Sequence, residues 1–204
     1  MHGSGGGPDA HAAPRRILDA AARRIAEDGA AALALNDVAA AAGVSKALIH
    51  YHFRDKDTLL TRLVEHILDG LLARERAALA PYVSEHSPLA VDALWHWLED
   101  ELRRGSIRIL LDLDGYPGPS VRAAARRAAT QRREAAAETI ERLFAALELR
   151  SRVAIPLLAN VTVAFIDGLA LDMDRSGQDG WPAGGRAPRV AFDVFWLAML
   201  SLAE

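Results

Sequence analysis

The stretch that decides the fold is residues 36–56, NDVAAAAGVSKALIHYHFRDK. An alanine-rich run predicts a short helix over about 36–42, and a second short helix is expected from Ser45 to about Phe53. Gly43 supplies the left-handed turn between them, and serine is a preferred helix N-cap. This spacing is typical of a helix-turn-helix, whose second helix projects from the surface and can enter a DNA major groove.

The flanking sequence favours helices nearly throughout. Alanine supplies 41 of the 204 residues, and no alternation of β-branched residues is present. Apolar residues at helical spacing predict a first helix from Pro14 to Gly29 and a long helix from a cap at or near Asp55 to Ala80, ended by Pro81. Further helices are expected at about 89–104, 107–114, 120–149, 154–175 and 190–203. The predicted fold is all-α, with about nine helices.

The string GVSKALIHYHFRDKDTLL, residues 43–60, preceded by an apolar helix ending at Gly29, resembles the N-terminal domain of the TetR/AcrR family of bacterial transcriptional regulators. The resemblance covers about a quarter of the chain. It implies a helix-turn-helix domain over 14–57, with the motif at about 34–53, and a helical ligand-binding and dimerisation domain over 58–204. The glycine-rich residues 1–13 are expected to be a flexible arm.

The motif predicts the residues that touch DNA. We expect contacts from Asn36, Ser45, Lys46, Ala47, Leu48, His50, Tyr51 and Lys56. Ser45 and the free amides after it suit a phosphate, and Lys46 adds a charge there. Ala47 and Leu48 can reach only a thymine methyl.

The remaining DNA contacts are predicted from the chemistry of each side chain or from the resemblance, and some of these side chains could instead pack in the core. His50 can donate to a base or a phosphate, and the Tyr51 phenol suits a phosphate oxygen, whereas the resemblance implies a phosphate contact for Lys56. Tyr51 could instead be a core aromatic, as Phe53 is expected to be, and His52 a partly buried packing residue. The family often has a hydroxyl residue capping the first motif helix. Ala34 stands there, so Asn36 is expected to take over the cap.

Charge supports DNA binding only weakly. Residues 1–56 carry a formal charge of +1 and the remainder −4, for a total of −3. The sign is the one that a DNA-binding N-terminal region needs, but the excess is small. We therefore expect modest nonspecific affinity for double-stranded DNA, with specificity arising from two recognition helices that read a pseudo-palindromic operator.

The C-terminal region predicts a self-association surface and a ligand site. Its last helix is apolar on all sides apart from Asp193, so a second copy of the chain is expected to cover it, although burial within one subunit is the alternative. The expected dimer interface is Val161, Phe165, Gly168, Phe192, Phe195, Trp196 and Met199. Aromatic side chains could line an effector cavity, and we name Trp95, Trp97, Tyr116 and Phe144 as ligand-binding candidates.

Several classes are excluded or disfavoured. The chain has no cysteine, its histidines share no helical face, and no nucleotide-binding fingerprint or catalytic triad occurs, so no metal, cofactor or catalytic residue is expected. No run of eighteen uncharged apolar residues and no signal peptide are found, which favours a cytoplasmic protein without membrane contact. The predicted function is a transcriptional repressor released from DNA by a small molecule. The alternative is an all-helical small-molecule carrier or enzyme.

Overall fold

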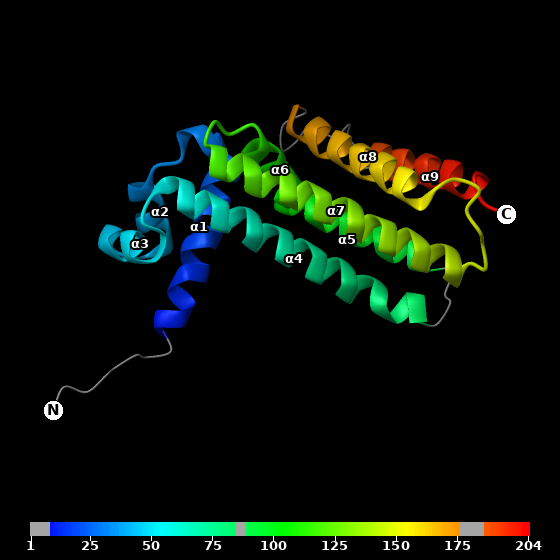
Figure 1. Ribbon diagram of the computed structural model, residues 1–204, viewed down its shortest axis with the longest axis horizontal. Helices are drawn as coiled ribbons and strands as arrows, with labels where there is room; N and C mark the ends of the chain where they lie inside the picture. Colours follow the sequence, from blue (N-terminus) through cyan, green and yellow to red (C-terminus); the bar gives the residue numbers. More distant parts are fainter. Residues whose placement is uncertain (1–8, 85–88, 176–185) are drawn as a thin grey trace. The chain divides into compact units, whose positions relative to one another are not determined.

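The computed structural model describes residues 9–84, 89–175 and 186–204. These residues form nine α-helices and no strand, which confirms the all-α prediction (Figure 1). The helices are α1 (Asp9–Ala32), α2 (Leu35–Ala42), α3 (Lys46–Phe53), α4 (Lys56–Ser84), α5 (Ala90–Arg104), α6 (Ser106–Asp114), α7 (Pro119–Ala146), α8 (Ile155–Arg175) and α9 (Arg186–Ser201).

Two compact units make up the fold. The first unit is Met1–Ile67 with Ile109–Arg126, and the second unit is Leu68–Arg108 with Arg127–Glu204. Helices α4, α6 and α7 therefore contribute residues to both units. The predicted domain boundary at residue 57 differs from this division, because the return of residues 109–126 to the first unit is a long-range contact without a local sequence pattern.

Helix α1 starts earlier than the sequence predicted. It begins at Asp9 and contains Pro14, the predicted first residue. A proline in the second turn removes one backbone hydrogen bond, and the alanines around it still favour helix. Ala13 is buried, so part of the expected flexible arm belongs to the fold, whereas residues 1–8 lie outside the described residues. Gly29, at φ 80° and ψ 160°, interrupts the helical backbone where the sequence predicted a stop.

The core of the first unit is built from the apolar faces of α1 to α4. Each of these helices contributes side chains that are almost fully buried: Ile17, Val38, Ile49, Phe53, Leu59, Leu60, Leu63 and Val64. Burial of one such side chain stabilises the fold by about 1.5–3 kcal/mol. This core holds the two short helices α2 and α3, which have too few residues to be stable alone.

The turn between α2 and α3 has the predicted geometry. Gly43 is left-handed, with φ 64° and ψ 39°, and its amide donates to the Ala40 carbonyl over 3.2 Å. The next amide, of Val44, donates to the Ala39 carbonyl over 3.0 Å. These two bonds satisfy carbonyls at the end of α2 that would otherwise lack partners. A side chain at position 43 would be strained by the positive φ.

Two predicted helix ends are corrected by the structure. Ala34 occupies the N-cap position of α2 without a side-chain bond, and Asn36 lies inside the first turn, so Asn36 does not take over the cap. Helix α4 continues past Pro81 to Ser84. A proline removes one amide donor and crowds the carbonyl four residues earlier, and this disruption affects few helical bonds when it falls in the last turn.

In the second unit, α9 is covered on one side by the unit itself. Figure 1 shows α8 and α9 side by side. The rings of Phe165 on α8 and Phe195 on α9 stack with their centroids 4.3 Å apart. Phe192, Trp196 and Met199 are buried in the core of the unit. The sequence predicts these three side chains at a dimer interface, but they point inward because α9 packs one face against its own subunit.

Candidate functional site

Helix α3 presents an exposed face opposite its buried one. Ile49 and Phe53 face the core, and Phe53 is a core aromatic as expected. The predicted contacts on the other face are solvent-exposed: Ser45, Lys46, Ala47, His50 and Tyr51. Tyr51 is 80% exposed, which excludes the core alternative for this side chain. Leu48 is half-buried and therefore less accessible than these five residues.

The N-terminus of α3 is capped as predicted. The hydroxyl of Ser45 accepts a hydrogen bond from the Leu48 amide over 3.2 Å. The amides of Lys46 and Ala47 lie in the first turn, where a helix has no internal acceptors. The positive end of the helix dipole adds to these donors, so the start of α3 is suited to an anionic oxygen.

The aromatic side chains of α3 are oriented by short-range contacts. A ring nitrogen of His50, Nδ1, lies 2.7 Å from the Arg54 carbonyl oxygen. Because a carbonyl oxygen only accepts, Nδ1 donates, and Nε2 remains available for another partner. His52 is half-buried, as expected, and its ring meets the ring of Tyr51 edge-on at 5.0 Å. The His50 ring is therefore held by a bond to its own turn, and the Tyr51 ring rests against His52.

Lys56 is held inside the first unit. Its ammonium group donates to the Ala31 carbonyl over 3.2 Å and lies 5.5 Å from the centre of the Tyr116 ring. Partial burial lowers the pKa of Lys56. Tyr116, a predicted ligand residue, thus lies beside Lys56 in the first unit and does not line the cavity described below. Burial, followed by the nearby charge of Asp57, raises the pKa of Tyr116.

Asp112 lies far from the helix-turn-helix in the sequence but contacts the turn before it in the fold. A carboxylate oxygen of Asp112 accepts a hydrogen bond from the Ala30 amide over 2.6 Å, directly after the irregular Gly29. Together with the bond from Lys56 to Ala31, it fixes the turn that leads from α1 into α2. The contact spans 82 positions in the sequence, so no local motif could have revealed it.

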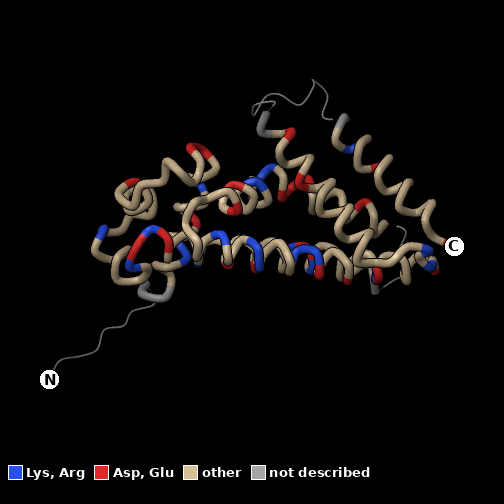
Figure 2. Tube along the Cα trace, turned by 45° about the horizontal axis from the view of Figure 1, so that its top comes forward, with Lys and Arg blue, Asp and Glu red and all other residues tan. Residues whose placement is uncertain are grey.

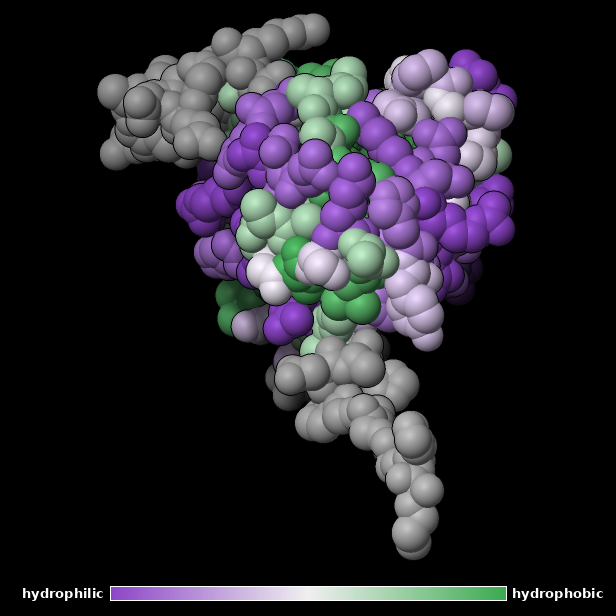
Figure 3. All heavy atoms as spheres, turned by 90° about the vertical axis from the view of Figure 1, so that its left-hand side faces the viewer, coloured by the Kyte–Doolittle hydropathy of each residue, from purple (hydrophilic) through white to green (hydrophobic). Residues whose placement is uncertain are grey.

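The surface around these residues is mixed in charge. Figure 2 shows basic and acidic residues alternating along the helices rather than one large basic block. The face drawn in Figure 3 is mostly hydrophilic, with a small apolar cluster. Binding of an anionic ligand by this face would therefore depend more on contacts from a few individual side chains than on a strong positive electrostatic field.

The second unit encloses an apolar cavity. Its polar or ionisable lining consists of Glu75, Arg132, Thr139, Thr162 and two tryptophans, and aliphatic and phenyl side chains form the rest. Of the four predicted ligand residues, Trp97 lines the cavity. Trp95 and Phe144 are buried next to lining residues, since Trp95 packs on Phe192 and Phe144 on Trp196.

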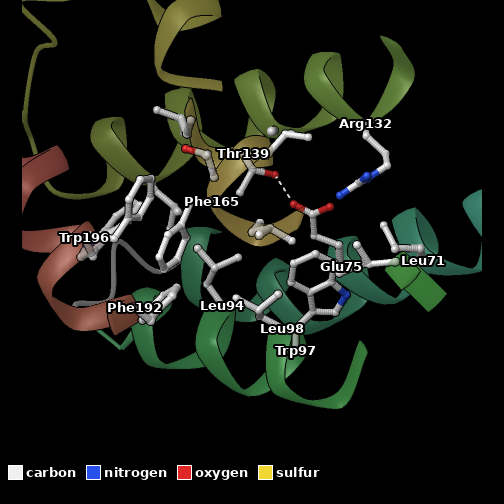
Figure 4. A pocket seen from close by; sticks show the side chains of 18 of the residues that line it. Leu71, Glu75, Leu94, Trp97, Leu98, Arg132, Thr139, Phe165, Phe192 and Trp196 are labelled. Carbon is white, nitrogen blue, oxygen red and sulfur yellow. Dashed lines mark hydrogen bonds between the residues drawn. The ribbon is translucent and has the colours of Figure 1, made fainter. Parts of the chain in front are cut away.

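Glu75 is the buried acid of this cavity. Figure 4 shows its side chain between Thr139 and Arg132, above the indole of Trp97. The hydroxyl of Thr139 donates to a Glu75 carboxylate oxygen over 2.8 Å. Burial raises the pKa of Glu75, and the Thr139 bond and nearby arginines, Arg132 foremost, oppose that rise. No local pattern singles out Glu75, because an acid on an apolar helix usually marks the solvent face.

Helices α8 and α9 also expose apolar side chains. On α8 these are Leu157, Val161 and Leu171, and on α9 they are Val190, Val194 and Leu197. Gly168, a predicted interface residue, is exposed on α8, and an added Cβ would meet nothing within 4 Å. Among the described residues, Ile155–Met173 alone has the length and composition of a membrane span, with mean hydropathy 1.5. Such a test also selects apolar helices that a protein partner covers.

The N-terminal part of the chain matches a known family. Residues 17–63 match the model described as "Bacterial regulatory proteins, tetR family". The regulator AcrR of Shigella flexneri is 27% identical over 99 residues, 48% of this chain and 46% of its own length. BetI of Rhizobium meliloti is 35% identical over 71 residues, 33% of this chain and 35% of its own length. The chain thus matches less than half of each of these relatives.

Similarity of structure extends over nearly the whole chain. A structure titled "SmeT-Triclosan complex" has a TM-score of 0.67 at 20% identity and covers 92% of this chain and 91% of its own. At so low an identity, this structural similarity shows a shared fold and nothing further. The named relatives are transcriptional regulators, so they give no support to an enzyme. Residues 17–63, which include α2 and α3, are thus similar to the tetR family of bacterial regulatory proteins.

Proposed function

We propose that this protein is a sequence-specific DNA-binding transcriptional repressor, which works as a homodimer in the cytoplasm and is released from its operator by a small molecule. The observation that carries the proposal is the exposed face of α3, with an ordered His50, a highly exposed Tyr51 and a capped N-terminus. A helix presented in this way suits the major groove.

Phosphate contacts would position α3, and base edges would be read by few residues. Ser45, Lys46 and Tyr51 suit phosphate oxygens, and His50 suits a base or a phosphate. Ala47 and Leu48 offer only apolar contact to a thymine methyl. Asn36 and Lys56 complete the proposed set, although Lys56 must keep its bond to Ala31 while it binds phosphate. Its ammonium has three donors, so the two roles are compatible.

A second copy of the chain is the proposed cover for the exposed apolar residues of α8 and α9. On α8 the exposed positions Leu157, Val161 and Gly168 recur at helical spacing, and Val190, Val194 and Leu197 recur in the same way on α9. Two such helices from each subunit would form a four-helix interface. Phe165 and Phe195 would support it from below through their stacked rings.

The cavity of the second unit is the proposed effector site. Its free volume is about 50 Å³, far below the roughly 300–1,000 Å³ of typical ligand pockets. An effector would therefore enter only if lining side chains move. That movement would distinguish an effector-bound conformer from the conformer that binds the operator. A conformer preference of about 2.7 kcal/mol would weaken operator binding about a hundredfold.

Selection of bound oligonucleotides from a random pool tests the proposal. We expect enrichment of a pseudo-palindromic site and salt-sensitive binding. If about four phosphates per subunit are neutralised, the slope of log K against log salt is about −7. A carrier or enzyme would enrich no sequence. Reporter expression from the selected site distinguishes repression, which we expect, from activation.

A further inference from the structure

We propose that the cavity of the second unit binds an apolar cation, such as a protonated amine or a quaternary ammonium, with its charge against the Glu75 carboxylate. The inference deepens the proposed effector site and depends on it only for the consequence of binding, not for binding itself.

The first observation is an incompletely satisfied carboxylate. Glu75 is 7% exposed, and its bond from Thr139 is the only hydrogen bond that it makes within the described part of the chain. An ionised carboxylate has about four acceptor positions. A buried carboxylate with so few partners is costly unless another group compensates it. The cavity lies directly beside it (Figure 4).

The second observation is the balance of charge. Glu75 and Arg132 are the ionisable residues that line the cavity. Arg132 is itself buried and forms an ion pair with Asp167 at 2.6 Å. Figure 4 shows its guanidinium turned toward Glu75, so the same group lies near two carboxylates, those of Glu75 and Asp167. Two further arginines, Arg76 and Arg142, act on Glu75 from outside the lining. Within the lining, Glu75 shares its one cation with Asp167, and a monovalent cation in the cavity would add to this partial compensation.

The third observation is the aromatic wall. Trp97, Phe165, Phe192, Phe195 and Trp196 line the cavity. The faces of such rings attract cations, and their area suits an apolar remainder. The indole nitrogens of Trp97 and Trp196 are buried without an acceptor in the described structure. They offer donors to an acceptor atom elsewhere in the ligand, so a neutral acceptor is the competing ligand chemistry.

A matched pair of probes isolates the contribution of the positive charge. Phenyltrimethylammonium and tert-butylbenzene have nearly the same shape and differ in charge. Binding to the full chain is followed by tryptophan fluorescence and by calorimetry. We expect the cation to bind and its neutral analogue to bind at least about tenfold more weakly. Longer alkyltrimethylammonium ions extend the series, and failure of every cation to bind would overturn the inference.

Glu75→Gln tests the role of the carboxylate. This variant keeps the shape and the acceptor for Thr139 but removes the charge, and we expect cation affinity to fall by about tenfold or more. Glu138→Gln, an exposed acid on α7, is the matched control and should bind like the parent chain. Melting temperatures show whether each variant is folded. If Glu75→Gln proves unfolded, Thr139→Val replaces it, because the carboxylate then loses its orienting bond and cation affinity should again fall.

The outcomes separate this inference from the proposed function. Equal cation affinity in folded Glu75→Gln and the parent chain would overturn the role of Glu75, even if the protein binds its operator normally. Equal affinity for the charged and the neutral probe would overturn the inference, because binding would then not depend on the charge of the ligand. Absence of operator binding would contradict the proposed function and leave a Glu75-dependent cation site in place.

Discussion

The two units of this protein hold their candidate sites in different ways. In the first unit, His50 and Ser45 are fixed by partners three or four residues away, and the face that they share is open to solvent. In the second unit, Glu75 is bound by Thr139, 64 positions away, within an enclosed cavity. An exposed site with local supports can lose a side chain with little effect on stability. A buried site with distant supports is part of the core, so changes there affect binding and folding together.

The largest expected effect concerns the exposed apolar face of α8 and α9. Val194→Arg would place a charge at the proposed interface twice, once from each subunit. Desolvation of the two charges should weaken dimerisation by about 4 kcal/mol or more. Sedimentation velocity measures the change, and a mostly monomeric, folded chain is expected at micromolar concentration. Arg142→Ala, at an exposed residue of α7, serves as the control. If the Val194→Arg variant remains a dimer, the interface does not include this face of α9.

The buried ion pair of the second unit comes next. Asp167→Ala leaves Arg132 buried without its partner, and the free energy of unfolding should fall by about 2–3 kcal/mol, allowing for the partial exposure of Asp167. Urea denaturation measures this loss. Glu138→Ala removes a carboxylate from an exposed pair and should cost less than about 1 kcal/mol. Similar losses in both variants would mean that the second unit does not enclose its charges as described.

Tyr51→Ala tests the opposite behaviour in the first unit. Because the side chain is 80% exposed, the free energy of unfolding should change by less than about 0.5 kcal/mol. Operator affinity should fall by about tenfold or more, since each subunit loses a contact. Fluorescence anisotropy with the selected operator gives the affinity, and Tyr51→Phe indicates how much the phenol contributes. Full affinity in the alanine variant would remove Tyr51 from the contact set.

Ser45→Ala gives the smallest expected change. Loss of the cap should cost about 1 kcal/mol of stability and a comparable part of the operator binding energy. Chemical denaturation and anisotropy report the two quantities on the same variant. Ser45→Asp restores an acceptor for the Leu48 amide and should recover stability while repelling phosphate. Recovery of both properties would contradict a phosphate contact at the start of α3.

The same contrast explains what the sequence could predict. Gly43, Ser45 and Phe53 act through contacts within a few positions, so the motif predicted their turn, cap and core roles, which the structure confirms. Asn36 was wrong as a cap because the exact helix start depends on how α2 packs. The exposure of Tyr51 could be resolved only by the fold, since an aromatic at that spacing suits either a core or a surface.

Contacts between residues far apart in the chain could not be predicted from local sequence patterns. Asp112 reaches the Ala30 amide across 82 positions, and the polar lining of the cavity comes from helices far apart in the chain. Trp97 was identified for the cavity, whereas Tyr116 belongs to the first unit beside Lys56. The type of an aromatic residue does not indicate which residues it will contact in the fold. Composition therefore limits the candidate ligand-binding residues but does not show where the cavity lies.

The most direct test of the central claim varies the spacing between the two half-sites of the selected operator. Two α3 helices that read successive major grooves on one side of the duplex require half-site centres about 10 base pairs, or about 34 Å, apart. Insertion of about 5 base pairs should abolish specific binding, and insertion of about 10 should restore part of it, because the grooves return to the same face. Affinity that does not depend on this spacing would contradict the account.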